Sequence, residues 1–182
     1  KIAASTITEV KRERPNKGLV LFVHGGAFIS GPTELHWNVL KKIAAKTGKT
    51  VWLCDYPKAP KNQIATISKN IDLVYARVLE EYSANEITLL GDSVGGTLVT
   101  ALTQRLIQKN IELPTKIILV CPVMDATMCN PKIEEADVRD PMLSKAGVLS
   151  AKKMCAGEMD LKNEMLSPIY GSFNGFPKTI LF

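Results

Sequence analysis

The chain has 182 residues, of which 46% are hydrophobic and 23% are charged, and its formal net charge is +5. This composition is that of a folded domain with a sizeable core, and it excludes a disordered chain. The lysines are scattered and aromatic residues make up only 6% of the chain, which disfavours nucleic-acid binding.

Five short apolar runs predict strands of a mainly parallel sheet that is covered on both faces, because each run is continuous and does not alternate. Helical patterns separate the first four runs, and Gly48 is a plausible C-terminal stop for the first of these helices. The alternation predicts a doubly wound α/β fold in one domain over residues 1–182. The runs are residues 19–23, 51–54, 87–90, 117–121 and 179–182.

The three predicted helices each carry an apolar stripe at spacings of three and four residues. We expect the long second stripe to pack on the sheet, and a partner-binding helix is the alternative. The stripes consist of Trp37, Leu40 and Ala44; Ile64, Ile67, Ile71, Val74 and Val78; and Leu98, Ala101, Leu102 and Leu106.

Residues 124–165 differ from the rest, since they hold all six methionines, two prolines and many charges. Two interpretations stay open. The segment is either a surface excursion in which methionine fills gaps, or a cap-like insertion whose flexible apolar side chains line an acyl pocket.

The four cysteines form neither a CxxC pair nor a zinc spacing, and no metal site is expected. Cys54 and Cys121 end apolar runs and are expected to be buried thiols. Reduced structural cysteines favour a reducing compartment, here the cytoplasm. No apolar stretch is long enough to span a membrane and no signal peptide is visible, so stable membrane insertion is not expected.

Residues 91–96, Gly-Asp-Ser-Val-Gly-Gly, carry the clearest chemical signal. They follow an apolar run and precede the amphipathic residues 97–110, which gives the order strand, sharp turn, helix. Glycines at the flanking positions permit a strained turn that lifts the hydroxyl of Ser93 out of the sheet at a helix N-terminus. The pattern predicts a nucleophile elbow.

A second glycine segment, His24-Gly25-Gly26-Ala27, follows the first apolar run. Glycines let the backbone approach a ligand closely and aim N–H groups at it. Together with the N–H of Val94, this segment is the candidate oxyanion hole.

A serine nucleophile also needs a general base and an orienting acid. His24 is expected to hold the shape of the glycine loop, and His36 is expected to be a partly exposed surface residue. No histidine follows Ser93 in the chain. No dinucleotide-binding or phosphate-loop fingerprint is present, so no cofactor is expected.

These motifs resemble the hormone-sensitive-lipase-like (HGGG-type) esterase family of α/β-hydrolases over residues 19–182. The glycine segment is similar to that family's oxyanion motif, with Ala27 in place of the third glycine, and residues 91–96 are similar to its Gly-Asp-Ser-Ala-Gly-Gly elbow. Alanine keeps its N–H, so the hole survives if the local backbone tolerates the methyl group. Further similar segments are residues 55–60, 122–125, 140–144, 167–168 and 175–177.

The resemblance implies a carboxylic-ester hydrolase with Ser93 as nucleophile and an acyl-enzyme intermediate. It implies Gly25, Gly26, Ala27 and Val94 as the oxyanion environment. The implied substrate is a small-molecule acyl ester.

The resemblance also implies supporting roles for His24 and Asp92, and it excludes Asp125 as the catalytic acid. It places the acid after the strand at residues 179–182 and the histidine one strand later, so both are expected beyond residue 182. An N-terminal cap segment is likewise expected outside these residues, and the 182 residues alone are expected to be nearly inactive.

Two other functions share the elbow. A ligand-binding protein on a hydrolase scaffold would lack the base, and a peptidase of the same fold would cleave amides. The esterase type of glycine segment favours the esterase over the peptidase. The sequence does not predict the oligomeric state.

Overall fold

The computed structural model describes residues 1–182 and contains a six-stranded sheet of order β1-β3-β2-β4-β5-β6. All neighbours from β3 to β6 pair in parallel, and only β1 runs antiparallel, beside β3. The mainly parallel sheet is thereby confirmed. The strands are β1 (Thr6–Val10), β2 (Asn16–Val23), β3 (Lys49–Asp55), β4 (Ile87–Asp92), β5 (Lys116–Val120) and β6 (Lys178–Leu181).

The edge strand β1 was not predicted, for a physical reason. Its sequence, Thr-Ile-Thr-Glu-Val, contains no continuous apolar run, and none of its residues is buried. Such a strand forms because the open edge of β3 offers backbone hydrogen bonds, and a local pattern does not reveal that partner.

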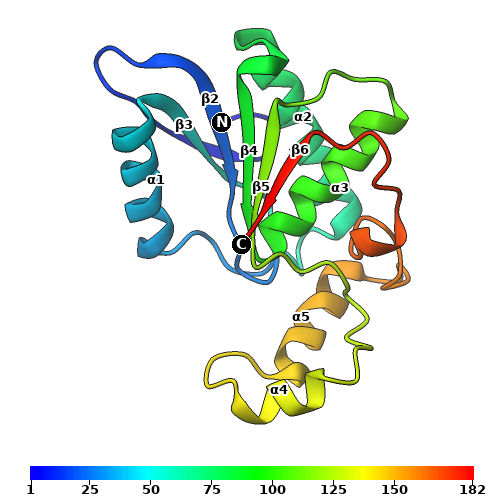
Figure 1. Cartoon of the computed structure of the whole chain (residues 1–182). Coiled ribbons are helices and arrows are strands. Elements are labelled where there is room, and N and C mark those ends of the chain that lie inside the picture. Colours follow the sequence, from blue (N-terminus) through cyan, green and yellow to red (C-terminus); the bar gives the residue numbers. More distant parts are fainter.

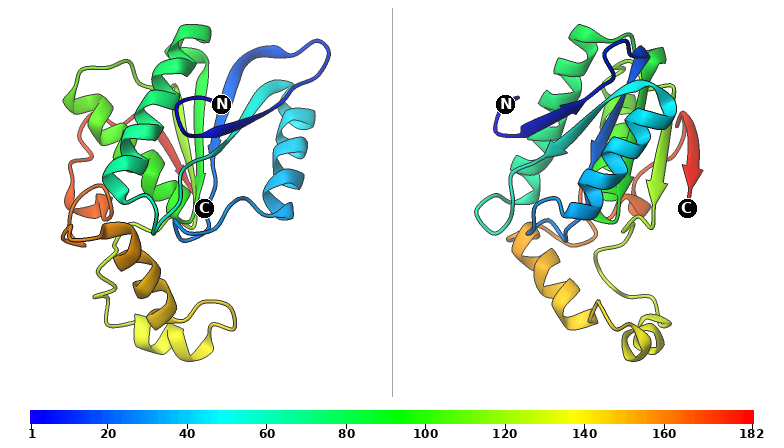
Figure 2. Two further views of the ribbon diagram at one scale, coloured as in Figure 1. Left: turned by 180° about the vertical axis from the view of Figure 1, so that it is seen from behind. Right: turned by 90° about the vertical axis from the view of Figure 1, so that its left-hand side faces the viewer.

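Helices cover both faces of the sheet, as expected for a doubly wound fold (Figures 1 and 2). One face carries α1 (Glu34–Thr47), which buries Leu40 and Ala44 and ends at Gly48 in the left-handed conformation (φ 71°). The other face carries α2 (Ile64–Glu81) and α3 (Val94–Gln108).

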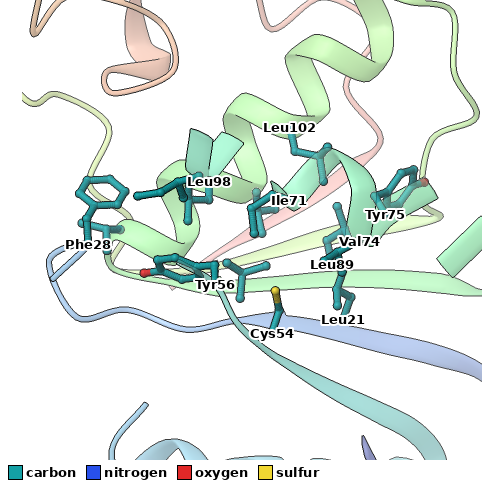
Figure 3. Close-up of a cluster of buried hydrophobic side chains, with 14 of the residues drawn as sticks. Leu21, Phe28, Cys54, Tyr56, Ile71, Val74, Tyr75, Leu89, Leu98 and Leu102 are labelled. Atoms are coloured by element: carbon teal, nitrogen blue, oxygen red, sulfur yellow. The ribbon is translucent and has the colours of Figure 1, made fainter. Parts of the chain in front are cut away.

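The larger core cluster has 27 buried residues and lies between the sheet and the α2–α3 face (Figure 3). The five residues of the α2 stripe are all 0% exposed, so the stripe packs on the sheet and is not free for a partner. The α3 stripe is buried as well.

The segment 124–165 projects from the carboxyl ends of the strands (Figure 1). It contains α4 (Ile133–Arg139), which buries no residue, and α5 (Lys145–Ala156), which anchors the segment through Ala151, Cys155 and Ala156. Two short 3₁₀ helices, Ala84–Glu86 and Pro168–Tyr170, complete the structure. None of the helices combines the length and the hydropathy needed to cross a membrane.

The prediction for the cysteines is half right. Cys54 is buried, and burial raises its pKa to about 12. Cys121 is exposed, because β5 ends at Val120 and the chain turns outward at Cys121 with φ 43°. All four cysteines are free thiols.

Candidate active site

Ser93 lies in the tight turn between β4 and α3, with φ 50° and ψ −122°. This conformation is strained for a residue with a side chain. The turn is also too crowded for side chains at its glycines. A Cβ atom at Gly95 would lie 2.0 Å from the carbonyl oxygen of Val23, and one at Gly91 would lie 2.5 Å from that of Gly95. The glycine pattern is therefore a steric requirement of the turn.

The backbone of Ser93 is held from both sides. Its N–H donates to the carbonyl of Val120 (2.9 Å), and its carbonyl accepts from the N–H groups of Gly96 (3.0 Å) and Val123 (3.1 Å). These bonds stabilise the strained conformation by fixing the turn to the end of β5. The Ser93 hydroxyl is partly exposed and makes no hydrogen bond within the chain.

The glycine loop after β2 lies directly against this turn, because β2 and β4 are neighbours in the sheet. A Cβ atom at Gly25 would lie 2.5 Å from Asp92 Oδ2 and 3.1 Å from Ser93 Cβ. The next residues all have positive φ: Gly26 at 119°, Ala27 at 52° and Phe28 at 66°. The methyl group of Ala27 is thus accommodated in the left-handed region, at a cost of about 1 kcal/mol.

Three backbone N–H groups near Ser93 remain without an acceptor. Gly26 and Ala27 donate to no group in the chain, and Val94 is the first residue of α3, where N–H groups have no intrahelical partner. The N–H of Gly25 is different, since it donates to Asp92 Oδ1 (2.8 Å). Gly25 therefore shapes the loop, and its own N–H is occupied.

Asp92 joins the two motifs through its carboxylate. Besides the bond from Gly25, its Oδ2 lies 3.3 Å from Nε2 of His36. The Nδ1 atom of His36 accepts from the N–H of Thr33 (2.9 Å), which places the ring proton on Nε2, facing Asp92. The elbow, the glycine loop and the start of α1 thus form one connected unit.

This role of His36 was not predicted from the sequence. The side chain is 12% exposed, in keeping with the partly exposed position expected, but its contact with Asp92 was not predicted. The available signal was its place three residues after Thr33, in the pattern of a helix capping box, where a side chain turns back toward the N-cap.

His24 is fully buried at the start of the glycine loop. Its Nδ1 hydrogen-bonds the Gly25 carbonyl, and its Nε2 lies 3.3 Å from Asp55 Oδ1. The ring stacks on Tyr56 at 4.7 Å, and the Tyr56 hydroxyl donates to the His24 carbonyl (3.0 Å). Burial lowers the pKa of His24, so the ring is held neutral.

The site can therefore present a hydroxyl nucleophile beside free N–H donors, an arrangement suited to an acyl group that develops negative charge on oxygen. Neither histidine hydrogen-bonds the Ser93 hydroxyl. No group of three or more His, Cys, Asp or Glu side chains is placed to hold a metal ion.

The chain is similar to known proteins along most of its length. A family model described as "alpha/beta hydrolase fold" matches residues 20–182. An esterase of Acinetobacter venetianus is 28% identical over 178 residues, covering 95% of this chain and 58% of its own length.

Two solved structures extend the likeness. One, from Staphylococcus aureus, has a TM-score of 0.95 and 30% identity, covering all of this chain and 62% of its own. A hormone-sensitive lipase from a metagenome library has a TM-score of 0.89 and 25% identity, covering 95% of this chain and 60% of its own. The chain thus spans less than two thirds of each of these proteins.

Proposed function

Because the chain belongs to the hormone-sensitive-lipase-like family of α/β-hydrolases, we propose that it supplies the nucleophile and the oxyanion hole of a carboxylic-ester hydrolase. The observation that carries the proposal is the environment of the Ser93 hydroxyl. Its hydroxyl stands free at a strained turn, next to N–H groups that have no acceptor in the chain.

In the proposed reaction, the Ser93 oxygen attacks the ester carbonyl and its proton passes to a general base. The N–H groups of Gly26, Ala27 and Val94 stabilise the oxyanion of the tetrahedral intermediate. The base then returns the proton to the alcohol as the carbon–oxygen bond breaks. Water, activated by the same base, releases the acid from the acyl-enzyme.

We propose that the base and its acid come from outside these 182 residues. His24 is buried and engaged with Asp55 and the Gly25 carbonyl, and His36 is engaged with Asp92 and Thr33. His36 would have to give up the hydrogen bond that its Nδ1 accepts from Thr33 to take a proton from Ser93, and the fully buried His24 makes no contact with the Ser93 hydroxyl. The relatives are longer than this chain, which supports a base placed elsewhere in the whole protein.

The substrate class that we propose is a small-molecule acyl ester. The segment 124–165, at the carboxyl ends of the strands, would serve as a cap over the site, and the reaction requires no cofactor. The free thiols fit a reducing compartment such as the cytoplasm.

The decisive experiment is carried out on the whole protein. A fluorophosphonate probe should label Ser93, p-nitrophenyl acetate should be turned over, and Ser93→Ala should lower kcat by about 10⁴-fold or more. Ser150→Ala, which changes an exposed serine on α5, is the matched control and should behave as wild type. Absence of both labelling and turnover would overturn the proposal.

The second candidate is a ligand-binding protein on the hydrolase scaffold. It is favoured by one observation, that no histidine of the chain contacts the Ser93 hydroxyl. Saturable binding of an ester without turnover in the whole protein would establish it. A peptidase is separated from an esterase by comparing matched amide and ester substrates.

A further inference from the structure

A cavity of about 500 Å³ lies between the loop after β5 and the helices α4 and α5. It borders the elbow through Val123, whose N–H donates to the Ser93 carbonyl. Half of its 16 lining residues are hydrophobic, among them Met124, Val148 and Ile169. A substrate held at Ser93 would therefore have room to extend into this space.

Most charged groups that line the cavity already form hydrogen bonds or ion pairs with neighbouring residues. Asp125 accepts from the N–H and the hydroxyl of Thr127, and Asp137 accepts from the N–H of Lys145. Asp140 accepts from two backbone N–H groups of the following turn. The Lys145 ammonium pairs with Glu134.

Lys152 is the exception. It projects from α5 and is only 2% exposed, and the carboxylate of Asp125, whose charge partly offsets the lowering of the Lys152 pKa by burial, lies beyond ion-pair distance. Its Nζ atom lies 3.0 Å from the Asp125 carbonyl oxygen and 3.0 Å from Met128 Sδ, both of which are uncharged. A lysine ammonium has three N–H donors, so one remains without an acceptor.

A buried cation without a direct ion pair is costly, and an anionic ligand bonded to it would relieve that cost. Burial lowers the pKa of Lys152 to about 8, which leaves the side chain mostly protonated at neutral pH. The three lining aspartates already accept hydrogen bonds from other groups, so Lys152 is the buried group of the cavity wall that has a donor to spare for an anion. The hydrophobic half of the lining suits a short hydrocarbon chain that ends in that anion.

We propose that Lys152 binds a carboxylate at the far end of the acyl chain, so that the preferred substrates are monoesters of short dicarboxylic acids. This inference rests on the proposed esterase function and names its substrate class. Lys152 is then a specificity-determining residue, and the lining side chains bind the methylene groups between the carboxylate and the ester.

The competing role for Lys152 is structural, because its hydrogen bond to the Asp125 carbonyl also connects the loop after β5 to α5. The two roles differ in what they discriminate. If Lys152 is only structural, its replacement should lower kcat/KM equally for all esters. If it binds a carboxylate, its replacement should lower kcat/KM selectively for anionic esters.

The test compares mono-p-nitrophenyl glutarate with the neutral p-nitrophenyl pentanoate, using the whole protein. Lys152→Met removes the charge and keeps an unbranched apolar side chain. We expect it to lower the glutarate-to-pentanoate ratio of kcat/KM by at least about tenfold. Lys153→Met, which removes the same charge from the neighbouring exposed position, should leave that ratio unchanged.

An equal loss on both esters, or no change in the ratio, would overturn the inference. A measurement without turnover separates it from the esterase proposal. Monomethyl glutarate should raise the Tm of the wild type and of Lys153→Met but not that of Lys152→Met. If monomethyl glutarate raised the Tm of the wild type but no ester were hydrolysed, the esterase proposal would be wrong and the carboxylate site would stand. If monomethyl glutarate did not raise the Tm of the wild type, the carboxylate site would be wrong.

Discussion

The elbow and glycine loop, and the segment 124–165, are built in opposite ways. In the first region, backbone atoms touch backbone atoms, and the glycines leave no space for a Cβ atom. In the second, α4 buries nothing, and Val138 is 88% exposed. Side-chain caps from Asp125 and Asp140 hold the turns on either side of α4, and the segment reaches the core only through Ala126 and the end of α5.

The difference indicates that the two regions have different functions. The reacting atoms need positions fixed within a fraction of an ångström, which a crowded, strained turn provides. Recognition of different acyl groups requires less precise positions of the residues that line the pocket. Loops outside the sheet can vary in sequence without disturbing the core. Four predictions, ordered from the largest expected effect to the smallest, test this contrast.

Replacing Gly95 with alanine should be the most damaging change. The new Cβ atom would lie 2.0 Å from the Val23 carbonyl, so the elbow or β2 must move. We expect the free energy of unfolding to fall by more than about 4 kcal/mol, measured by urea denaturation. Gly31→Ala is the control, because a Cβ atom there meets nothing within 4 Å, and a comparable loss in both variants would refute the steric account.

Asp92→Asn should disable the site while leaving the fold in place. The amide cannot accept from both Gly25 and His36, so the loop that carries the Gly26 and Ala27 N–H groups loses an anchor. We expect kcat for a neutral ester to fall roughly 10²-fold with little change in KM.

His36→Gln keeps an N–H donor toward Asp92 and should lose less activity than Asp92→Asn. If Asp92→Asn retained wild-type kcat, the elbow and the loop would not be coupled in the way the hydrogen bonds indicate.

Acid should destabilise the protein through His24. The buried ring is neutral in the folded protein, and its pKa is lowered by burial, whereas in the unfolded chain it binds a proton near pH 6.5. The unfolded state therefore takes up more protons, and the free energy of unfolding should fall as the pH drops below about 6.5. NMR titration should give His24 a pKa below 6.5, and a higher value would contradict the prediction.

Val138→Ser on α4 should have the smallest effect. The side chain packs against nothing, so the free energy of unfolding should change by less than about 0.5 kcal/mol. Ile71→Ala, in the buried stripe of α2, should cost about 2–5 kcal/mol in the same urea experiment. Equal costs would show that the segment 124–165 is packed as firmly as the core.

The sequence alone determined the parallel sheet, the helices on its two faces and the strand–turn–helix around Ser93. These features follow from local patterns: continuous apolar runs, stripes at helical spacing and glycines where a tight turn excludes side chains. The positions of Ser93 and of the glycine loop followed from the same local rules, because parallel strands end at one edge of the sheet.

Only the tertiary structure decided what depends on partners far apart in the chain. Strand β1 forms because β3 offers an edge, and Cys121 turns outward because β5 stops one residue earlier. His36 reaches Asp92 because the start of α1 folds over the elbow, and Lys152 becomes a buried cation because α5 docks on the loop after β5. No local pattern encodes these contacts, since each depends on the surface presented by a segment distant in sequence. For that reason Ser93 and the glycine loop were visible from the sequence, whereas the contacts of His36 and Lys152 were not.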